Sequence, residues 1–256
     1  GEGTRMKSAT PKVLHALAGK TFLQRVMLAV QATQPSSIAV VVRHQAQKVA
    51  EAALTYNQNA VIVQQDELPG TGRAVQCAMN ELRDNGANKG TILITAGDMP
   101  MLDGNTLTSL VREHEKSENV ATILSCVLDN PFGYGRIIRD SAGGFIRIVE
   151  QKDGSEKELA VHEVNTSVYA FDAQVLAQSI EKIKSSNAQQ EFYLTDALAY
   201  AREMGTVGIV TVDNPLRVEG VNDRVQLSKL AKAHNQEICE YWMRQGVSIL
   251  DPDTTW

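Results

Sequence analysis

Short, almost wholly apolar runs alternate with amphipathic stretches over the first half of the chain. Residues 37–42, 60–63 and 91–95 form three such runs, and strands buried on both faces have this composition. Between them, apolar residues recur at helical spacing: Phe22, Val26, Met27 and Val30 behind a Thr21 cap, then Val49, Ala52 and Ala53, then Ala74, Ala78 and Leu82. This alternation predicts an α/β fold with a mostly parallel central sheet covered by helices on both faces.

The pattern changes after about residue 120. Shorter strands with turn signals such as residues 130–133 and 142–144 predict a smaller β-rich lobe. Helical patterns return at residues 173–183 and 195–204, with a strand at 207–212. A long amphipathic stretch from Asp223 to Arg244 then predicts a terminal helix, whose apolar stripe is Leu227, Leu230, His234, Ile238 and Tyr241.

Composition excludes several classes of protein. The 256 residues carry a net charge of −5 with both signs interspersed, which argues against a nucleic-acid partner. No apolar run reaches the roughly 20 residues of a membrane-spanning helix, and no targeting segment is present. Cysteines and histidines lack metal-ligand spacing. We expect Cys77, Cys126 and Cys239 to be buried thiols in a reducing cytoplasm, and His15, His44, His114, His162 and His234 to be surface or hydrogen-bonded core residues.

A glycine-rich turn opens the chain at residues 1–6, and its Arg5 lies seven residues before Lys12. Glycines let backbone N–H groups approach a phosphate, and fixed cations neutralise the charge of a transferring phosphoryl group. The alternative is a surface turn with solvated cations. In an α/β fold such a loop follows the first strand, so we predict a strand before Gly1.

The apolar run 91–95 is followed by Ala96 and Gly97, and Asp98 comes next. The carboxyl ends of parallel strands are where ligands bind, and a carboxylate there suits Mg²⁺ bridged to phosphate oxygens. The alternative is a turn or helix-capping aspartate, since Pro100 and Asp103 lead into a helix.

Further polar segments interrupt the apolar pattern. Gln65 and the turn Gly70-Thr71-Gly72 follow another strand, and a side-chain amide reads a base edge because it both donates and accepts hydrogen bonds. In the second half, carboxylates and amides suited to sugar hydroxyls occur in residues 133–136, 149–153, 165–166 and 219–222. Each segment is also explained by an ordinary turn.

Taken together, these segments resemble the sugar-1-phosphate nucleotidyltransferases, whose opening signature is a glycine loop ending in GTRM followed by PK. Within that family the chain is most similar to the uridyltransferase domain of the bifunctional bacterial enzymes that make UDP-N-acetylglucosamine. The shared motifs occur in the family's order over residues 1 to about 230. They are residues 1–6, Pro11 to His15, Gln65 with residues 70–72, Gly97-Asp98, residues 133–137, Val149-Glu150, Asn165-Thr166 and residues 219–222.

The resemblance implies a Rossmann-like nucleotidyltransferase fold and a role for each matching residue. Arg5, Lys12 and Asp98 would be catalytic, and Asp98 and Asn222 would bind Mg²⁺. Gln65, Gly70 and Thr71 would hold uracil, and Gly135, Glu150 and Asn165 would hold N-acetylglucosamine. Ala96 and Gly97 would contribute backbone groups and shape, although relatives often carry Tyr or Ser in place of Ala96. Glu191, Tyr193 and Thr195 resemble a further segment of the sugar pocket.

The implied reaction joins UTP to N-acetylglucosamine 1-phosphate and releases UDP-N-acetylglucosamine and pyrophosphate. Residues 1–222 would form the nucleotidyltransferase domain, 223–246 an arm helix and 247–256 the start of a left-handed β-helix. A full-length protein of this kind would also acetylate glucosamine 1-phosphate, form a homotrimer and serve peptidoglycan and lipopolysaccharide synthesis in the cytoplasm. The alternatives are a nucleotidyltransferase for another base or sugar phosphate, or a non-catalytic nucleotide-sugar-binding module.

Overall fold

A computed structural model describes residues 3–84, 89–185 and 190–256, so Gly1 and Glu2 of the glycine loop lie outside the described residues. The predicted alternation of strands and helices is confirmed. The strands are β1 (Ala16–Leu17), β2 (Lys20–Thr21), β3 (Ala39–Val42), β4 (Val61–Gln64), β5 (Thr91–Ile94), β6 (Ala121–Val127), β7 (Arg136–Arg139), β8 (Phe145–Val149), β9 (Glu163–Asp172) and β10 (Val207–Val212).

The helices begin and end close to the predicted positions. They are η1 (Thr4–Met6), η2 (Lys12–Leu14), α1 (Phe22–Gln31), α2 (Ala46–Tyr56), α3 (Thr71–Asp84), α4 (Gly104–Lys116), α5 (Glu156–Leu159), α6 (Ala173–Ile180), α7 (Leu194–Met204), η3 (Pro215–Val218) and α8 (Arg224–Arg244). Thr21 caps α1 by accepting a hydrogen bond from the Gln24 N–H at 3.1 Å, an interaction that stabilises a helix by about 1 kcal/mol.

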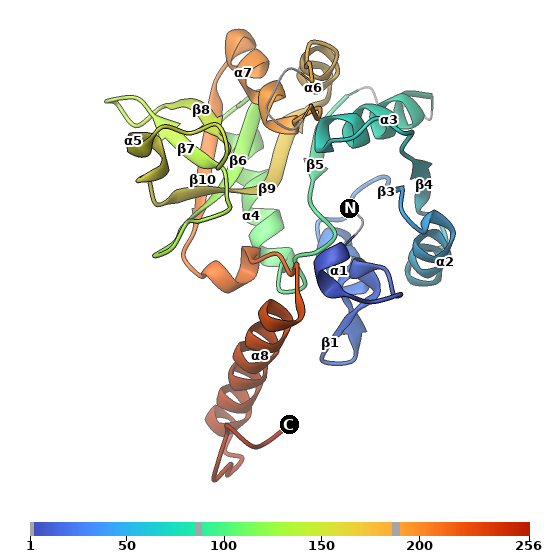
Figure 1. Cartoon of the computed structure of the whole chain (residues 1–256), viewed down its shortest axis with the longest axis vertical. Helices are drawn as coiled ribbons and strands as arrows, with labels where there is room; N and C mark the ends of the chain where they lie inside the picture. Colours follow the sequence, from blue (N-terminus) through green and yellow to red (C-terminus); the bar gives the residue numbers. More distant parts are fainter. Residues whose placement is uncertain (1–2, 85–88, 186–189) are drawn as a thin grey trace.

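The main sheet is mixed rather than mostly parallel, which corrects the prediction. Its six strands run in the order β10-β6-β9-β7-β8, with β5 paired to β9 off this path. Only β10 and β6 pair in parallel in this sheet, because β9 runs antiparallel to β5, β6 and β7. The strands after residue 120 therefore extend the main sheet, and the hairpin β7–β8 with α5 projects from one side of it (Figure 1). The α/β class itself is confirmed.

The sheet divides into two branches along strand β9, and this point is called the fork of the sheet. One edge of β9 pairs with β6, while the other pairs with β5 through residues 169–172 and with β7 through Val164. β5 and β7 thus occupy opposite ends of the same edge, and Asn165 lies where they part. The loop that follows β5 and the turn that precedes β7 both emerge at this fork, so the topology brings Asp98 and Gly135 toward Asn165.

Strands β3 and β4 form a separate parallel pair, seen beside α2 and α3 in Figure 1. In the part of the chain that the structure describes, β3 pairs only with β4 and β5 only with β9. Most residues of β3, β4 and β5 are consequently half-buried, although their composition predicts burial on both faces. The predicted strand before Gly1 has no residues in this chain and stays a prediction.

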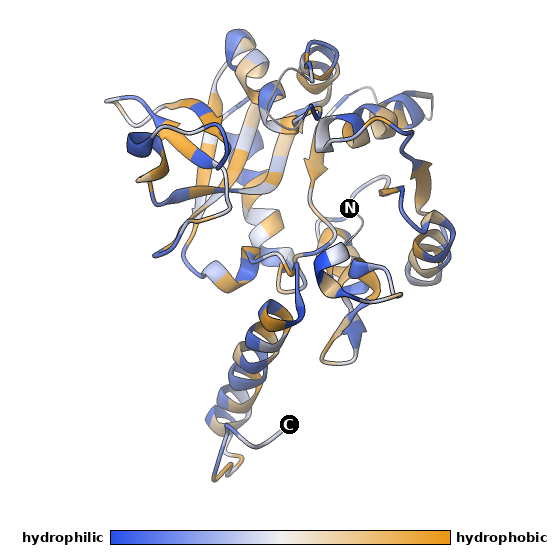
Figure 2. Cartoon of the chain, in the orientation of Figure 1, coloured by the Kyte–Doolittle hydropathy of each residue, from blue (hydrophilic) through white to orange (hydrophobic). Residues whose placement is uncertain are grey.

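The main core lies between the sheet and helices α3, α6 and α7, and a second cluster packs α1 and α4 against the other side of β6 and β9. The strands are correspondingly hydrophobic in Figure 2. α8 begins at an Asp223 cap and projects away from the sheet (Figure 1). No described helix is both long and apolar enough to cross a membrane.

Several local expectations are wrong. Leu230 is buried in α8, but Ile238 and Tyr241 are exposed, so only the first part of the predicted stripe packs on the domain. The apolar segment 247–252, where the predicted β-helix would begin, forms no strand in this structure. Cys77 is half-buried, whereas Cys126 and Cys239 are buried, and all three are free thiols. His15 Nε2 is buried without a hydrogen-bond partner, whereas His234 is hydrogen-bonded to Arg25 through Nε2, as expected, although its buried Nδ1 has no partner.

Candidate active site

Asp98, Lys12 and Asn222 meet in one cluster, although they lie far apart in the sequence. The Lys12 ammonium donates to Asp98 Oδ2 and, at 3.0 Å, to Asn222 Oδ1. The loop after β5 carries Asp98, and the Val221 N–H binds the Asp98 carbonyl oxygen at 2.9 Å. This backbone bond fixes the segment that carries Asn222 beside the loop that carries Asp98. The capping alternative for Asp98 is excluded, because Asp103 caps α4 by accepting from the Thr106 N–H.

The side-chain oxygens of Asp98 and Asn222 suit a hard divalent cation. Both accept a hydrogen bond from one ammonium group, so the two oxygens are near enough to share a single cation. Carboxylate and amide oxygens are ligands that Mg²⁺ prefers, and Mg²⁺ usually takes one or two protein ligands with water and substrate phosphates. Among the described residues, no group of three or more His, Cys, Asp or Glu side chains is arranged to hold a metal.

A second cluster lies at the fork of the sheet and consists of Gly135, Glu150, Asn165 and Thr195. The Asn165 N–H donates to the Gly135 carbonyl at 2.8 Å, and Thr195 Oγ1 donates to Glu150 Oε1 at 3.4 Å. A Cβ on Gly135 would lie 2.8 Å from Ile148 Cγ2 and 3.3 Å from Glu150 Oε2. A side chain at this position would therefore press on Ile148 and on the Glu150 carboxylate.

Glu150 and Asn165 are both held in fixed orientations. Burial raises the pKa of the Glu150 carboxyl, and the Thr195 hydrogen bond only partly offsets this effect. Asn165 Nδ2 donates to the Tyr169 hydroxyl at 2.8 Å, and Asn165 Oδ1 accepts from the Ser167 N–H at 3.2 Å. A carboxylate and an amide in these positions suit the recognition of a polyhydroxyl ligand.

Gln65, Gly70 and Thr71 form a third cluster, before α3. Gln65 Nε2 donates to the carbonyl oxygens of Leu68 and Gly70, at 2.9 and 3.2 Å. Thr71 Oγ1 accepts from the Leu194 N–H at 3.1 Å. The amide nitrogen of Gln65 and the acceptor of Thr71 therefore hold the loop together, and Gln65 Oε1 is the side-chain atom that remains to accept a hydrogen bond from a ligand.

The three clusters are joined. The start of α7 links two of them, because Leu194 binds Thr71 while the next residue, Thr195, binds Glu150. Tyr134 links the cation cluster to Gly135, its neighbour in sequence. Burial raises the pKa of the Tyr134 hydroxyl, and the nearby charges of Glu219 and Asp98 raise it further. The predicted base, sugar and metal residues therefore surround one region of the molecule.

Arg5 differs from the other predicted residues. It lies exposed in η1, and the described part of the chain provides no hydrogen bond or ion pair for its guanidinium. Ala96 and Gly97 are half-buried on the loop between β5 and Asp98. The role predicted for each of these residues stays a prediction.

Sequence reasoning missed two residues of α8. Gln226 Oε1 accepts from the Asn222 N–H at 2.7 Å, and Arg224 Nε donates to the Met6 carbonyl oxygen at 3.1 Å. The first turn of α8 therefore orients Asn222 and supports the end of the glycine loop. In the sequence, Arg224 and Gln226 are marked only by their position, because they follow closely after Asn222 and the helix-capping Asp223.

Gly70→Ala is expected to lower the free energy of unfolding by about 3 kcal/mol or more. Gly70 has φ +116°, and its Cβ would lie 2.3 Å from the Phe192 carbonyl oxygen and 2.5 Å from the Phe192 nitrogen. Gly19→Ala is the matched control, because Gly19 also has positive φ (+79°) but no atom within 4 Å of the added Cβ. Gly19→Ala should lower the free energy of unfolding by only about 1 kcal/mol. Equal losses in urea unfolding would show that packing against Phe192 is unimportant.

Comparisons with known proteins identify the family and the fold. The sequence profile of the family described as "MobA-like NTP transferase domain" matches residues 1–157. A solved Bacillus anthracis structure, assigned as a glucose-1-phosphate thymidylyltransferase in complex with sucrose, superposes with a TM-score of 0.70. It covers 99% of this chain and 95% of that chain at 17% identity, and it therefore supports the fold alone.

Curated relatives named "Bifunctional protein GlmU" align with the whole chain. Identity is 62% for Bifidobacterium animalis subsp. lactis, 63% for Bifidobacterium adolescentis and 48% for Paenarthrobacter aurescens, and each alignment covers 100% of this chain. The chain spans about half the length of these relatives, 56%, 56% and 52% respectively. The family profile, the fold and the clustered site residues agree, and the chain belongs to the MobA-like NTP transferase family.

Proposed function

We propose that the chain transfers a uridylyl group from UTP to N-acetylglucosamine 1-phosphate, giving UDP-N-acetylglucosamine and pyrophosphate. A phosphate oxygen of the sugar phosphate attacks the α-phosphorus of UTP in line. The new P–O bond forms as the bond to the β-phosphate oxygen breaks, and pyrophosphate leaves with that electron pair. The nucleophile is already an anion, so the reaction needs neither a general base nor a covalent enzyme intermediate.

One observation carries this proposal. The Lys12 ammonium is held between Asp98 and Asn222, next to a carboxylate and amide cluster suited to a sugar, in a chain 62% identical to a protein named "Bifunctional protein GlmU". Bringing two polyanions into contact requires cations placed between them. The cluster provides one fixed cation and the oxygens for another.

Asp98 and Asn222 would hold Mg²⁺, which when bound supplies charge neutralisation across both substrates' phosphates. Lys12, with Arg5, would then contact phosphate oxygens of the nucleotide. Gly135 leaves space beside the Glu150 carboxylate, which would accept hydrogen bonds from the sugar hydroxyls, and the Asn165 amide lies on β9. The chain's own groups thus bind, orient and neutralise, which is the main protein contribution to phosphoryl-type transfer.

Gln65 gives a physical reason for a preference for uracil. Its Nε2 is already used by the Leu68 and Gly70 carbonyls, so the available Oε1 is an acceptor. Uracil and thymine present a ring N3–H donor, whereas cytosine presents an acceptor at that position. The site therefore favours UTP over CTP, and contacts to the ribose 2′-hydroxyl would separate UTP from dTTP.

Pyrophosphate release with each nucleotide and sugar-phosphate pair tests the proposal. UTP with N-acetylglucosamine 1-phosphate should give a kcat/KM at least about tenfold above UTP with glucose 1-phosphate, or above CTP, GTP, ATP or dTTP. A higher kcat/KM with a different pair would show that the chain is a nucleotidyltransferase for that other nucleotide or sugar phosphate. No Mg²⁺-dependent release with any pair would leave a binding module and refute the proposal.

The raised pKa of Glu150 gives a pH dependence with a definite sign. An ionised carboxylate accepts hydrogen bonds from sugar hydroxyls, and it loses that capacity as pH falls through its pKa. Because burial raises the pKa of Glu150, the KM for the sugar phosphate should begin to rise at less acidic pH than an ordinary glutamate would give. The expected rise is about tenfold, since a hydrogen bond to a charged group contributes about 1.5 kcal/mol or more.

Glu150→Gln is the control for this pH effect. Glutamine does not titrate, so the variant should show a higher KM for the sugar phosphate whose rise in acid is smaller than that of the wild type, because only the substrate phosphate, with a second pKa of about 6, then titrates; the KM for UTP should equal that of the wild type at each pH. Steady-state kinetics between about pH 5 and pH 8 measure both values. A wild-type KM that does not rise in acid would contradict the role of Glu150.

We also propose the organisation that the relatives' length suggests. Residues 1–222 form the nucleotidyltransferase domain, 223–246 the arm helix and 247–256 the beginning of a β-helix domain in the whole protein. That protein would also acetylate glucosamine 1-phosphate and assemble as a homotrimer in the cytoplasm. The free thiols of Cys77, Cys126 and Cys239 are typical of a reducing compartment of this kind.

A further inference from the structure

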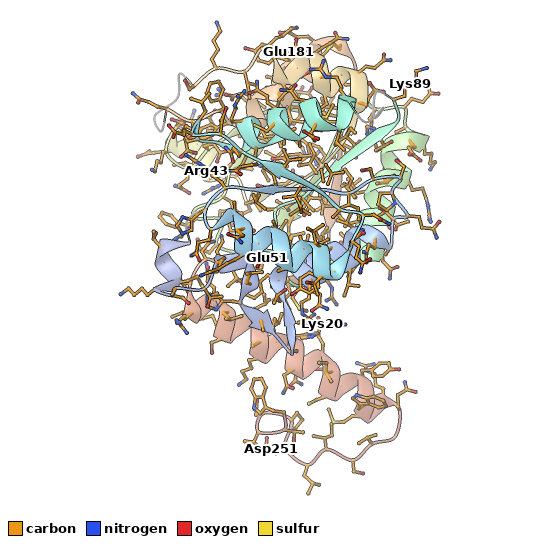
Figure 3. All side chains as sticks on the ribbon, turned by 90° about the vertical axis from the view of Figure 1, so that its right-hand side faces the viewer. Lys20, Arg43, Glu51, Lys89, Glu181 and Asp251 are labelled. Atoms are coloured by element: carbon orange, nitrogen blue, oxygen red, sulfur yellow. The ribbon has the colours of Figure 1, made fainter. Side chains whose placement is uncertain are left out.

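A cavity of about 300 Å³ lies outside the site described above, where α8 joins the rest of the chain. Its wall brings together six segments: β2, α1, the loop after Asp98, the start of α4, η3 and α8. The charged or titratable groups of the wall are Lys20, Arg25, Asp103, Arg217 and His234. Lys20 lies on the β1–β2 hairpin, labelled in Figure 3. A volume of this size accommodates a small metabolite.

Arg25 is the central cation of this cavity. Its Nε donates to the Leu17 carbonyl at 2.9 Å, and its Nη2 lies 3.1 Å from His234 Nε2. Both partners are uncharged when His234 is neutral, and within the described residues no carboxylate lies within ion-pair distance of Arg25. Partial burial lowers the pKa of the Arg25 guanidinium. A partly buried cation without a counterion is destabilising until an anion joins it.

The other charges of the wall leave a positive excess. Arg217 is neutralised, because its Nε lies 3.3 Å from Asp103 Oδ2 and its Nη2 lies 3.2 Å from Glu237 Oε1. The Lys20 ammonium has no ion-pair partner among the described residues. Lys20 and Arg25 are therefore the two cations of the wall without an ion-pair partner among the described residues, and together with Arg217, Asp103 and Glu237 they leave one net positive charge.

His234 lines the same wall. Its Nε2 receives the Arg25 hydrogen bond, so its Nδ1 carries the proton in the neutral ring. That Nδ1 is buried without a hydrogen-bond partner, and the Glu237 carboxylate is 4.0 Å away, too far for a hydrogen bond. A buried unpaired donor is rare in folded proteins.

We propose that this cavity is a second ligand site, which binds the phosphate group of a small phosphorylated metabolite between Lys20 and Arg25. The planar guanidinium of Arg25 offers paired N–H donors to phosphate oxygens, and Lys20, which also lines the cavity, supplies a second positive charge. The proposal does not rest on the proposed function, because none of these groups belongs to the cation, sugar or base clusters.

The position of the cavity connects it to the metal-binding loop. Pro100 and Met101 line the cavity, two and three residues after Asp98. A ligand would therefore contact the segment whose beginning carries Asp98, and at the same time the arm helix through His234. The site is placed where one metabolite touches both the catalytic loop and α8.

Crystals soaked in tungstate, an anomalously scattering phosphate analogue, locate the site directly. We expect an anomalous peak within hydrogen-bond distance of the Arg25 guanidinium in the wild type and none there in Arg25→Gln. A second peak beside Lys12 would be the active site, and it should persist in Arg25→Gln. Absence of the cavity peak in the wild type, or its persistence in Arg25→Gln, would overturn the proposal.

Titration calorimetry with inorganic phosphate tests the site in solution, on a Lys12→Met background that weakens binding at the active site. Lys20→Ala should weaken the remaining phosphate binding at least fivefold, because Lys20 is exposed and its loss leaves the fold intact. Lys48→Ala, which removes an exposed lysine of α2, is the matched control and should change nothing. Equal affinities for Lys20→Ala and Lys48→Ala would refute the role of Lys20.

The titration of His234 provides a third readout. Burial lowers its pKa, the charges of Arg25 and Arg217 lower it further, and Glu237 opposes them. Lys20 and Asp103 are the other charged groups of the wall. A bound phosphate dianion adds negative charge beside the ring, so NMR should report a higher His234 pKa with saturating phosphate than without it. No change in that pKa would contradict binding in this cavity.

Discussion

Asp98→Ala is expected to lower kcat at least about a thousandfold, because a metal contributes several kcal/mol of charge stabilisation and each 1.36 kcal/mol is about tenfold in rate. Asp98 is the only carboxylate proposed to bind the metal. Its side chain is 21% exposed, and Lys12 is the only polar side chain that the structure shows paired with it. The fold should therefore survive, with Tm within a few degrees of wild type.

Asp213→Ala is the matched control for this variant. Asp213 also follows a strand of the main sheet directly, after β10, but it is exposed and lies outside the three clusters. Its turnover should equal that of the wild type. Near-normal turnover for Asp98→Ala, measured as UTP- and Mg²⁺-dependent pyrophosphate release, would refute the assignment of the metal ligand.

Lys12→Met is expected to have two effects of opposite sign. Turnover should fall about a hundredfold to a thousandfold, the usual loss when one preorganised donor to developing charge is removed. Binding of Mn²⁺ to the substrate-free chain should become tighter, because the ammonium of Lys12 occupies the position between Asp98 and Asn222 that a metal would take. Metal entry in the wild type must displace that ammonium toward the substrate phosphates.

Electron paramagnetic resonance of free Mn²⁺ measures this second effect without any turnover. Mn²⁺ should bind more tightly to Lys12→Met than to the wild type and more weakly to Asp98→Ala, whereas Lys48→Met should match the wild type. If Lys12→Met and wild type bind Mn²⁺ equally, the ammonium does not compete for the metal position, and Lys12 acts only on the substrate.

The strands and helices were predictable because each one is encoded locally. The apolar runs became β3, β4 and β5, and the Thr21 cap starts α1 as expected. The direction of β9 was not predictable, because an apolar run carries no information about which neighbour it pairs with. The antiparallel pairing of β9 with β5, β6 and β7 makes the sheet mixed and creates the fork at Asn165, and β8 is antiparallel to β7 as well.

The sequence predicted which residues belong to the candidate site, but it did not predict which of them contact one another. Motif spacing identified Asp98 and Asn222, yet only the fold shows Lys12 between them. Gly70 was interpreted as a ligand contact, whereas its immediate environment is the Phe192 backbone. Gln226 was missed because a glutamine one turn into a helix resembles any solvated residue until the Asn222 N–H is placed beside it.

A crystal structure with Mg²⁺ and UDP-N-acetylglucosamine tests the central claim most directly. The metal should lie about 2.0 to 2.1 Å from one oxygen of Asp98, one oxygen of Asn222 and phosphate oxygens of the ligand. Lys12 should then have left Asn222 for a phosphate, and the sugar should contact Glu150. A metal bound without either protein oxygen, or a sugar bound away from Glu150, would contradict the account.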